Sequence, residues 1–121
     1  MAKILWKPKN IHKTHMFQFI NYINWSYGLK LNSYRELHQW SIENIPSFWK
    51  EIWGQSEIIH SRQFDNIIDD IKKMPGAQWF PGARLNFAEN LLRFQNDQIA
   101  IYAVAENLPL RKITYNYQDF F

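Results

Sequence analysis

Residues 74–93, MPGAQWFPGARLNFAENLLR, form the stretch on which the fold depends. Two Pro-Gly dipeptides, at 75–76 and 81–82, lie on either side of the aromatic pair Trp79 and Phe80. Proline presets a turn conformation and glycine supplies the positive φ that many turns need, so the backbone is expected to turn twice here. The stretch therefore predicts a rigid corner that presents two large apolar side chains.

A short helix is expected directly after this corner. Asn86 is followed three positions later by Glu89, which is the spacing of a capping box. In that motif two side chains satisfy free N–H groups at the start of a helix. The pattern predicts a helix from Asn86 to about Phe94.

Longer helices are expected upstream of the corner. Apolar residues recur at helical spacing from Met16, which predicts a helix ending near Gly28. Ser33 and Glu36 form a second capping box, ahead of a helix that runs to about Asn44.

A third helix is expected to begin at Pro46, since proline suits the first turn of a helix. It carries the most regular apolar stripe of the chain, made by Ile45, Phe48, Trp49, Ile52 and Trp53. The apolar spacing over residues 64–73 predicts a further short helix.

The end of the sequence is expected to form strands. Residues 98–105, QIAIYAVA, are almost continuously apolar, which is typical of a strand buried on both faces in a largely parallel sheet. A turn over 106–109 and a second strand over 110–115 follow, and residues 116–121 resemble the opening of a helix. A two-stranded pair is marginally stable in water, so we expect the sequence to be the front of something longer.

Composition narrows the class of protein. The 121 residues are 46% hydrophobic and carry a net charge of +3, with four lysines among the first 13 residues. Beyond this arm the charges nearly balance, so the basic character is weak support for a nucleic-acid or membrane partner. The chain has no cysteine, which excludes disulfides and thiolate metal sites and suits a cytoplasmic protein. No stretch approaches the length of a membrane span.

The residues that could carry chemistry do not combine into a site. The four histidines lack metal-pair spacing, and the acidic residues Asp65, Asp69 and Asp70 are expected to lie on a solvated face. No serine lies in a nucleophile elbow, and the four glycines form no phosphate-binding loop. We therefore expect no catalytic, cofactor-binding or metal-binding residue in this chain.

The tryptophans and Arg84 each allow two interpretations. Trp25, Trp40, Trp49 and Trp53 could stack on nucleic-acid bases beside the basic arm, but packing in a core is favoured because two of them share a helical stripe. Arg84 could pair with a phosphate or a carboxylate, and we favour a structural tie between the corner and the rest of the protein.

The sequence of the corner and its helix, WFPGARLNFAENLLR, resembles a segment near the start of the acetoacetyl-CoA synthetases, a family of adenylate-forming acyl-CoA synthetases. Residues 34–41, YRELHQWS, with Phe48, Trp49 and Trp53, are similar to the tryptophan-rich N-terminal helices of that family. Residues 113–115, ITY, are similar to a later strand. The resemblance covers most of residues 16–121.

This resemblance implies a fold and a domain organisation. It implies a mixed α and β fold, helix-rich in its first half and followed by a strand pair, as the front piece of a large α/β domain. Residues 1–13 would be an arm, residues 14–73 a helical N-terminal segment, and residues 74–121 the corner, short helix and first strands of the large domain. The rest of the ligase polypeptide would be the partner of this chain.

The resemblance also implies an activity for the complete enzyme. Such enzymes join an acid to CoA through an acyl-adenylate, with ATP, CoA and Mg2+ as cofactors. The phosphate loop, the acidic ribose motif and the catalytic lysine of the family match no position here, so the chain itself is expected to be structural and inactive.

Two alternatives remain. One is a ligase for another short acid, such as acetate or propionate, since these residues do not line the acyl pocket of the family. The other is a freestanding interaction module that uses the aromatic and basic residues.

Overall fold

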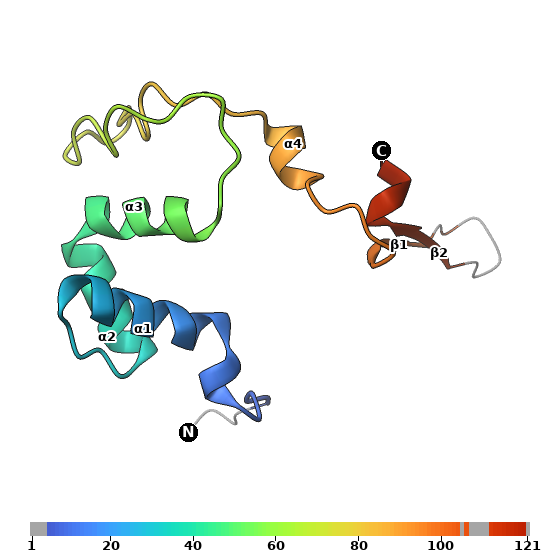
Figure 1. The fold of residues 1–121 in the computed structure, drawn as a ribbon, viewed down its shortest axis with the longest axis horizontal. Helices are drawn as coiled ribbons and strands as arrows, with labels where there is room; N and C mark the ends of the chain where they lie inside the picture. Colours follow the sequence, from blue (N-terminus) through green and yellow to red (C-terminus); the bar gives the residue numbers. More distant parts are fainter. Residues whose placement is uncertain (1–4, 105, 107–111, 121) are drawn as a thin grey trace. The chain divides into compact units, whose positions relative to one another are not determined.

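The computed structural model describes residues 5–104, 106 and 112–120. The chain divides into two compact units, Met1–Glu51 and Ile52–Phe121. Figure 1 shows the first unit as helical and the second as largely irregular, with a short helix and a strand pair toward its end. This composition confirms the mixed α and β fold expected from the sequence.

The first unit begins with a short 3-10 turn, η1 (Ile11–Lys13), followed by helix α1 (His15–Tyr27). The Thr14 hydroxyl accepts a hydrogen bond from the backbone N–H of Phe17 and caps the start of α1. The helix ends at Gly28, whose φ of 65° is left-handed and costs glycine little. The predicted helix ending near Gly28 is confirmed.

Helix α2 (Tyr34–Glu43) begins with the capping box that the sequence predicts. The Ser33 hydroxyl accepts from the N–H of Glu36 at 3.3 Å, and the Glu36 carboxylate accepts from the N–H of Ser33 at 3.2 Å. Helix α3 (Ile45–Gln55) follows after a single residue, Asn44. Both helices lie where they are predicted.

The core of the first unit lies between α1 and α2. Four side chains are buried there, and the phenyl ring of Phe48 on α3 packs against them. The Glu51 carboxylate on α3 accepts hydrogen bonds from the hydroxyls of Tyr22 and Tyr27 on α1, at 2.7 and 2.8 Å. Hydrophobic burial and one shared carboxylate therefore hold the bundle together. The buried residues are Ile20, Ile23, Leu37 and Trp40.

The short helix predicted over 64–73 is wrong. Residues in this range form bends, turns and isolated bridges, of which one pairs Ile68 with Trp79. Asp69 and Asp70 use their side chains to accept hydrogen bonds from nearby backbone N–H groups. Such local bonds compete with the hydrogen bonds of a helix, and the remaining backbone groups pair with the corner instead.

Helix α4 (Phe87–Leu91) follows the corner. The Asn86 side chain accepts from the N–H groups of Ala88 and Glu89, so the predicted helix start is confirmed. The helix ends at Leu91 rather than near Phe94. Asn96 then accepts from the N–H of Gln98 in a local turn, which favours a non-helical chain at this point.

Strands β1 (Ile99–Ala103) and β2 (Ile113–Asn116) form an antiparallel pair, and the 3-10 turn η2 (Tyr117–Phe120) follows. Both strands are confirmed. The 3-10 turn η2 lies where the sequence predicts the opening of a helix. The expected burial of β1 on both faces is not observed, because in the described chain β2 is its one strand neighbour. The predicted turn at 106–109 and the first residues of the second strand lie mostly outside the described residues.

In the part of the chain that the structure describes, no helix is both long enough and apolar enough to span a membrane.

Candidate functional site

The corner is held by a second stretch of chain that runs antiparallel beside it. Residues 61–69 pair with residues 78–84 almost entirely through backbone hydrogen bonds. These bonds satisfy the polar groups of two segments that form no regular strand. They are Ser61 N to Arg84 O at 2.8 Å, Arg84 N to Arg62 O at 3.0 Å, Asp65 N to Pro81 O at 2.8 Å, Phe80 N to Ile67 O at 2.8 Å, and Asp69 N to Gln78 O at 3.2 Å.

Gly82 lies in the corner beside the side chain of Asp65. Its φ is 84°, and a Cβ atom at this position would collide with the carboxylate of Asp65. The carboxylate is held in place by Arg62, whose Nη2 lies 3.1 Å from Oδ1. The left-handed φ therefore favours glycine at position 82, and a larger residue would also have to displace the exposed carboxylate of Asp65.

Three aromatic rings pack against one another beside the paired segments. The ring of Trp53, from the last turn of α3, lies 4.7 Å from the ring of Phe80 and 5.2 Å from that of Phe64. Phe64 and Phe80 are themselves 5.4 Å apart, measured between ring centroids. Such ring pairs stabilise a fold beyond the area they bury. The triangle joins the end of α3, residue 64 and the corner.

Asp69 organises the loop between the paired segments. Its carboxylate accepts from the N–H groups of Asp70 and Gln78, at 2.7 and 2.8 Å, and from the ammonium of Lys73. The hydrogen bond from Lys73, followed by that from Gln78, lowers the pKa of Asp69 to about 2. The predicted solvated acidic face is thus in part a set of turn-forming side chains.

Helix α4 is attached to the chain after α3 by two side chains. The Asn90 side chain accepts from the N–H of Ile59 and donates to its carbonyl, both at 2.8 Å, as a neighbouring strand would. Arg93 donates to the carbonyls of Ser56 and Glu57, at 3.0 and 3.1 Å. A cation at carbonyl groups just after a helix is favourable. Neither role can be predicted from the sequence, because the partner atoms belong to the backbone and leave no sequence pattern.

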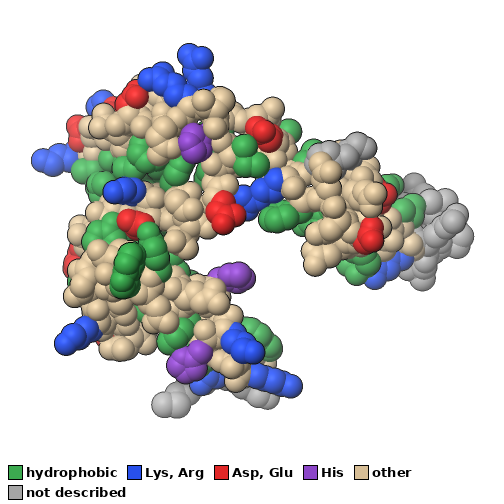
Figure 2. Space-filling model, viewed as in Figure 1, with side chains coloured by type: hydrophobic (Ala, Val, Ile, Leu, Met, Phe, Trp, Pro, Cys, Tyr) green, Lys and Arg blue, Asp and Glu red, His purple; other side chains and the backbone are tan. Residues whose placement is uncertain are grey.

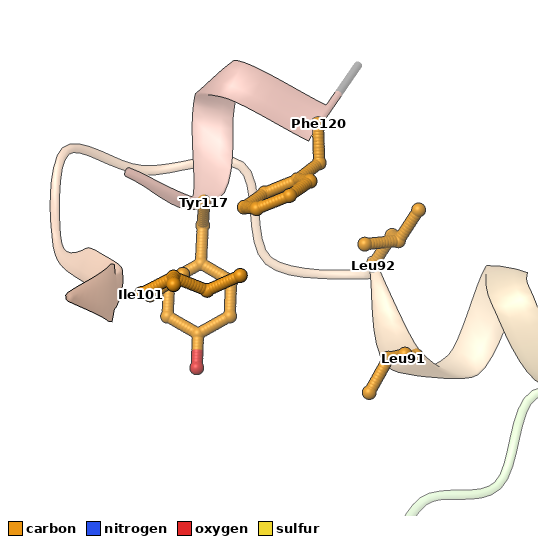
Figure 3. Close-up of a pocket in the computed structure, with 6 residues that line it drawn as sticks. Leu91, Leu92, Ile101, Tyr117 and Phe120 are labelled. Carbon is orange, nitrogen blue, oxygen red and sulfur yellow. The ribbon is translucent and has the colours of Figure 1, made fainter. Parts of the chain in front are cut away.

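An apolar pocket of about 300 Å3 lies between the end of α4 and the strand pair. Figure 3 shows Leu91 and Leu92 on one side and Ile101 on the other, with the Phe120 ring above and the Tyr117 hydroxyl directed away from Phe120. Ala100 completes the lining. Among the described residues no charged side chain lines this pocket, so this lining does not fit ATP, CoA phosphates or Mg2+, which need polar and charged partners.

Large apolar side chains also lie at the surface of the second unit, and Figure 2 shows apolar groups on the visible face of the molecule. All four buried side chains of the described chain belong to the first unit. Soluble proteins rarely leave large contiguous apolar patches in water, and such patches mark interaction surfaces. The exposed set in this unit includes Leu85, Phe87, Leu91, Phe94, Ile101, Tyr102 and Tyr115.

The tryptophan side chains lie in different environments. Trp40 is buried and Trp53 is packed in the aromatic triangle, as favoured from the sequence, whereas Trp25 is 82% exposed. Arg84 ties the corner to residues 61 and 62 through its backbone N–H and carbonyl. Among the described residues, no three histidine or acidic side chains gather in a group that could hold a metal ion.

The sequence of this chain is similar to those of known proteins. The family described as "Acetyl-coenzyme A synthetase N-terminus" matches residues 34–91. The chain is 44% identical over 117 residues to an acetoacetyl-CoA synthetase of Xenopus tropicalis, which covers 94% of this chain and 17% of that protein. It is also 41% identical over 111 residues to a malonamoyl-CoA synthetase of Penicillium aethiopicum, covering 86% of this chain and 15% of that protein.

A solved structure, an acetoacetyl-CoA synthetase from Streptomyces lividans, matches with a TM-score of 0.66 and 34% identity. It covers 76% of this chain and 15% of that one. Residues 34–91 therefore match the N-terminal segment of one class of proteins, the acyl-CoA synthetases, and the fold of this chain is similar to that of a solved member of the class. Within that class, the resemblance to the acetoacetyl-CoA synthetases is confirmed over nearly the whole chain, which spans 17% of the length of the Xenopus relative.

Replacement of Gly82 tests the close approach in the corner. Gly82→Ala is expected to lower the free energy of unfolding by about 1–3 kcal/mol, because it combines a left-handed φ with a collision at Asp65. The matched control is Gly54→Ala in α3, where no atom lies within 4 Å of the added Cβ. Urea unfolding of the 121-residue chain measures both, and equal stability of the two variants would contradict the packing described for Gly82.

The pKa of Asp69 predicts how the loop responds to acid. Because the fold lowers this pKa from 3.8 to about 2, the stabilisation is present above pH 4 and is lost as the pH falls toward 2. The amide 15N shift of Gln78, whose N–H donates to Asp69, should titrate with a midpoint near 2. Asp69→Asn should abolish this titration and Asp97→Asn should leave it unchanged. A midpoint near 4 in the unmodified chain would show that the carboxylate is not held.

Proposed function

We propose that this chain is the N-terminal segment of an ATP-dependent acid–CoA ligase that forms acetoacetyl-CoA from acetoacetate. The observation that carries the proposal is the similarity to acetoacetyl-CoA synthetases across 94% of the chain. The match includes the corner and α4, whose backbone pairing and caps organise the second unit. The activity belongs to the complete polypeptide.

The reaction proposed for the complete enzyme has two steps. An oxygen of the acid attacks the α-phosphorus of ATP, which releases pyrophosphate and leaves an acyl-adenylate. The thiol of CoA then attacks the acyl carbon, and AMP departs as the thioester forms. We assign ATP, CoA and Mg2+ to the rest of the polypeptide, and no catalytic, cofactor-binding or metal-binding residue to this chain.

The role proposed for this chain is structural. Residues 14–73 supply the N-terminal segment, which is helical as far as Gln55, and residues 74–121 supply the corner and first strands of the large domain, whose remainder is the partner. The exposed apolar surface of the second unit supports this role, because burying such surface stabilises an interface between segments. A cytoplasmic location is part of the same proposal.

A ligase for a different short acid is the second candidate. The observation that favours it is the 41% identity to a malonamoyl-CoA synthetase, which is nearly as high as the identity to the Xenopus acetoacetyl-CoA synthetase. Malonamate and acetoacetate both carry a carbonyl group β to the carboxylate and differ only in an amide or a methyl group beyond it. A substrate panel must therefore compare acids that carry this β-carbonyl group with acids that lack it.

The test uses the natural full-length polypeptide with ATP, CoA and one acid at a time. The panel is acetoacetate, malonamate, and two acids without a β-carbonyl, acetate and butyrate. Pyrophosphate release and thioester formation are followed together. The proposal predicts the highest kcat/KM for acetoacetate, by at least about tenfold over butyrate, since a site built to hydrogen-bond a substrate carbonyl discriminates strongly against its absence.

Three results would overturn parts of this account. A higher kcat/KM for malonamate would select the second candidate. Failure with every acid would remove the ligase assignment. Thioester formation by the isolated 121-residue chain would contradict its structural role.

A further inference from the structure

The two faces of the strand pair differ in chemistry. Side chains alternate between the faces of a strand, and the register places Ile101 opposite Tyr115 and Ala103 opposite Ile113. These four residues make one side on which the Tyr115 hydroxyl is the sole polar side-chain group, here called the apolar face. On the opposite side, here called the wet face, Tyr102 lies opposite Thr114, and the ammonium of Lys112 lies 3.8 Å from the centre of the Tyr102 ring.

The apolar face continues into the pocket beside α4. The register shifts between Ile99 and Ile101, so Ala100 is an extra residue that bulges from the ladder. A bulge redirects neighbouring side chains, and both Ala100 and Ile101 line the pocket. Phe120 extends the surface, since its ring lies 6.3 Å from that of Tyr115. The apolar face and the pocket therefore adjoin at Ile101, which belongs to both and lines the pocket in Figure 3.

We propose that an apolar segment from the remaining polypeptide covers the apolar face and inserts a side chain into the pocket, while the wet face stays in water. This inference rests on the proposed function, in which the chain is part of a longer ligase. It goes further by naming which side of the strand pair is covered. An antiparallel sheet commonly packs one face on a core and leaves the other solvated.

The chemistry of the wet face explains why it stays exposed. The Lys112 ammonium remains hydrated while it contacts the Tyr102 ring, which is a favourable arrangement in water. A covering segment would remove water from this charge, and burial of an unpaired charge is costly. The wet face is therefore expected to stay in water, and the 59% exposure of the Tyr102 side chain agrees with this.

The occupant is a segment of the same polypeptide rather than a second copy or a small molecule. The relatives are much longer than this chain, which spans 17% of the Xenopus protein, and a tethered segment acts at millimolar effective concentration. A small ligand is disfavoured because, among the described residues, Tyr117 alone brings a polar side chain to the lining, and several polar groups are needed to fix a ligand in place. The Tyr117 hydroxyl is directed away from Phe120 (Figure 3).

Thiol labelling of two adjacent positions tests this inference. The chain contains no cysteine, so Ile101→Cys and Tyr102→Cys each add one thiol to this segment, on opposite faces of β1. Both positions are exposed here, at 44% and 59%, so both thiols should react freely in the 121-residue chain. In the full-length polypeptide, the thiol at position 101 should react on the order of 100-fold more slowly, as expected for a group that reacts only after local opening.

The thiol at position 102 is the matched control and should keep its rate within about threefold in the full-length polypeptide, since no opening is needed there. Fast labelling at both positions would overturn the inference, and slow labelling at both would overturn the claim that one face stays wet. Protection at 101 that appears only at high protein concentration would assign the surface to a second copy. The readout is the mass of the labelled peptide and needs no substrate, so it is independent of the ligase assay.

Discussion

Backbone hydrogen bonds between residues 61–69 and 78–84 are the interaction on which the second unit depends. They fix the corner without a regular sheet, and within the corner Gly82 adopts a left-handed φ of 84° beside the carboxylate of Asp65. The triangle of Trp53, Phe64 and Phe80 packs beside this pairing. Asn90 and Arg93 then attach α4 to the chain that follows α3.

This arrangement orders the chain but buries little of it. The first unit has a small core of four buried residues, whereas in the described part of the second unit no large side chain is buried. Hydrophobic burial is the dominant favourable term in folding, so the second unit lacks most of the stabilisation that its composition could provide. The apolar face of the strand pair and the adjoining pocket are where that stabilisation would be gained. This imbalance supports the proposed scaffolding role, because such a surface becomes stable when another segment packs on it.

Local patterns were sufficient to predict most elements and insufficient for their pairing. The capping box of Ser33 and Glu36, the left-handed Gly28 and the cap at Asn86 are short-range features, so the sequence predicts the corresponding helix ends correctly. The apolar spacing at 64–73 predicts a helix that does not form. Asp69 and Asp70 accept hydrogen bonds from local N–H groups, and other backbone groups of this segment form hydrogen bonds with the corner. The contact of Gly82 with Asp65 and the bonds made by Asn90 join residues far apart in the sequence. No periodicity encodes such contacts.

The central claim is that the second unit gains its missing burial from the rest of a longer polypeptide. Amide hydrogen exchange of β1 and β2, compared between the 121-residue chain and the full-length polypeptide, tests it most directly. The account predicts fast exchange of these strands in the 121-residue chain and protection greater by on the order of 100-fold in the full-length polypeptide, since a marginal two-stranded pair opens readily when alone. Equal protection in both samples would contradict the claim, because the strand pair would then need no further segment to be stable.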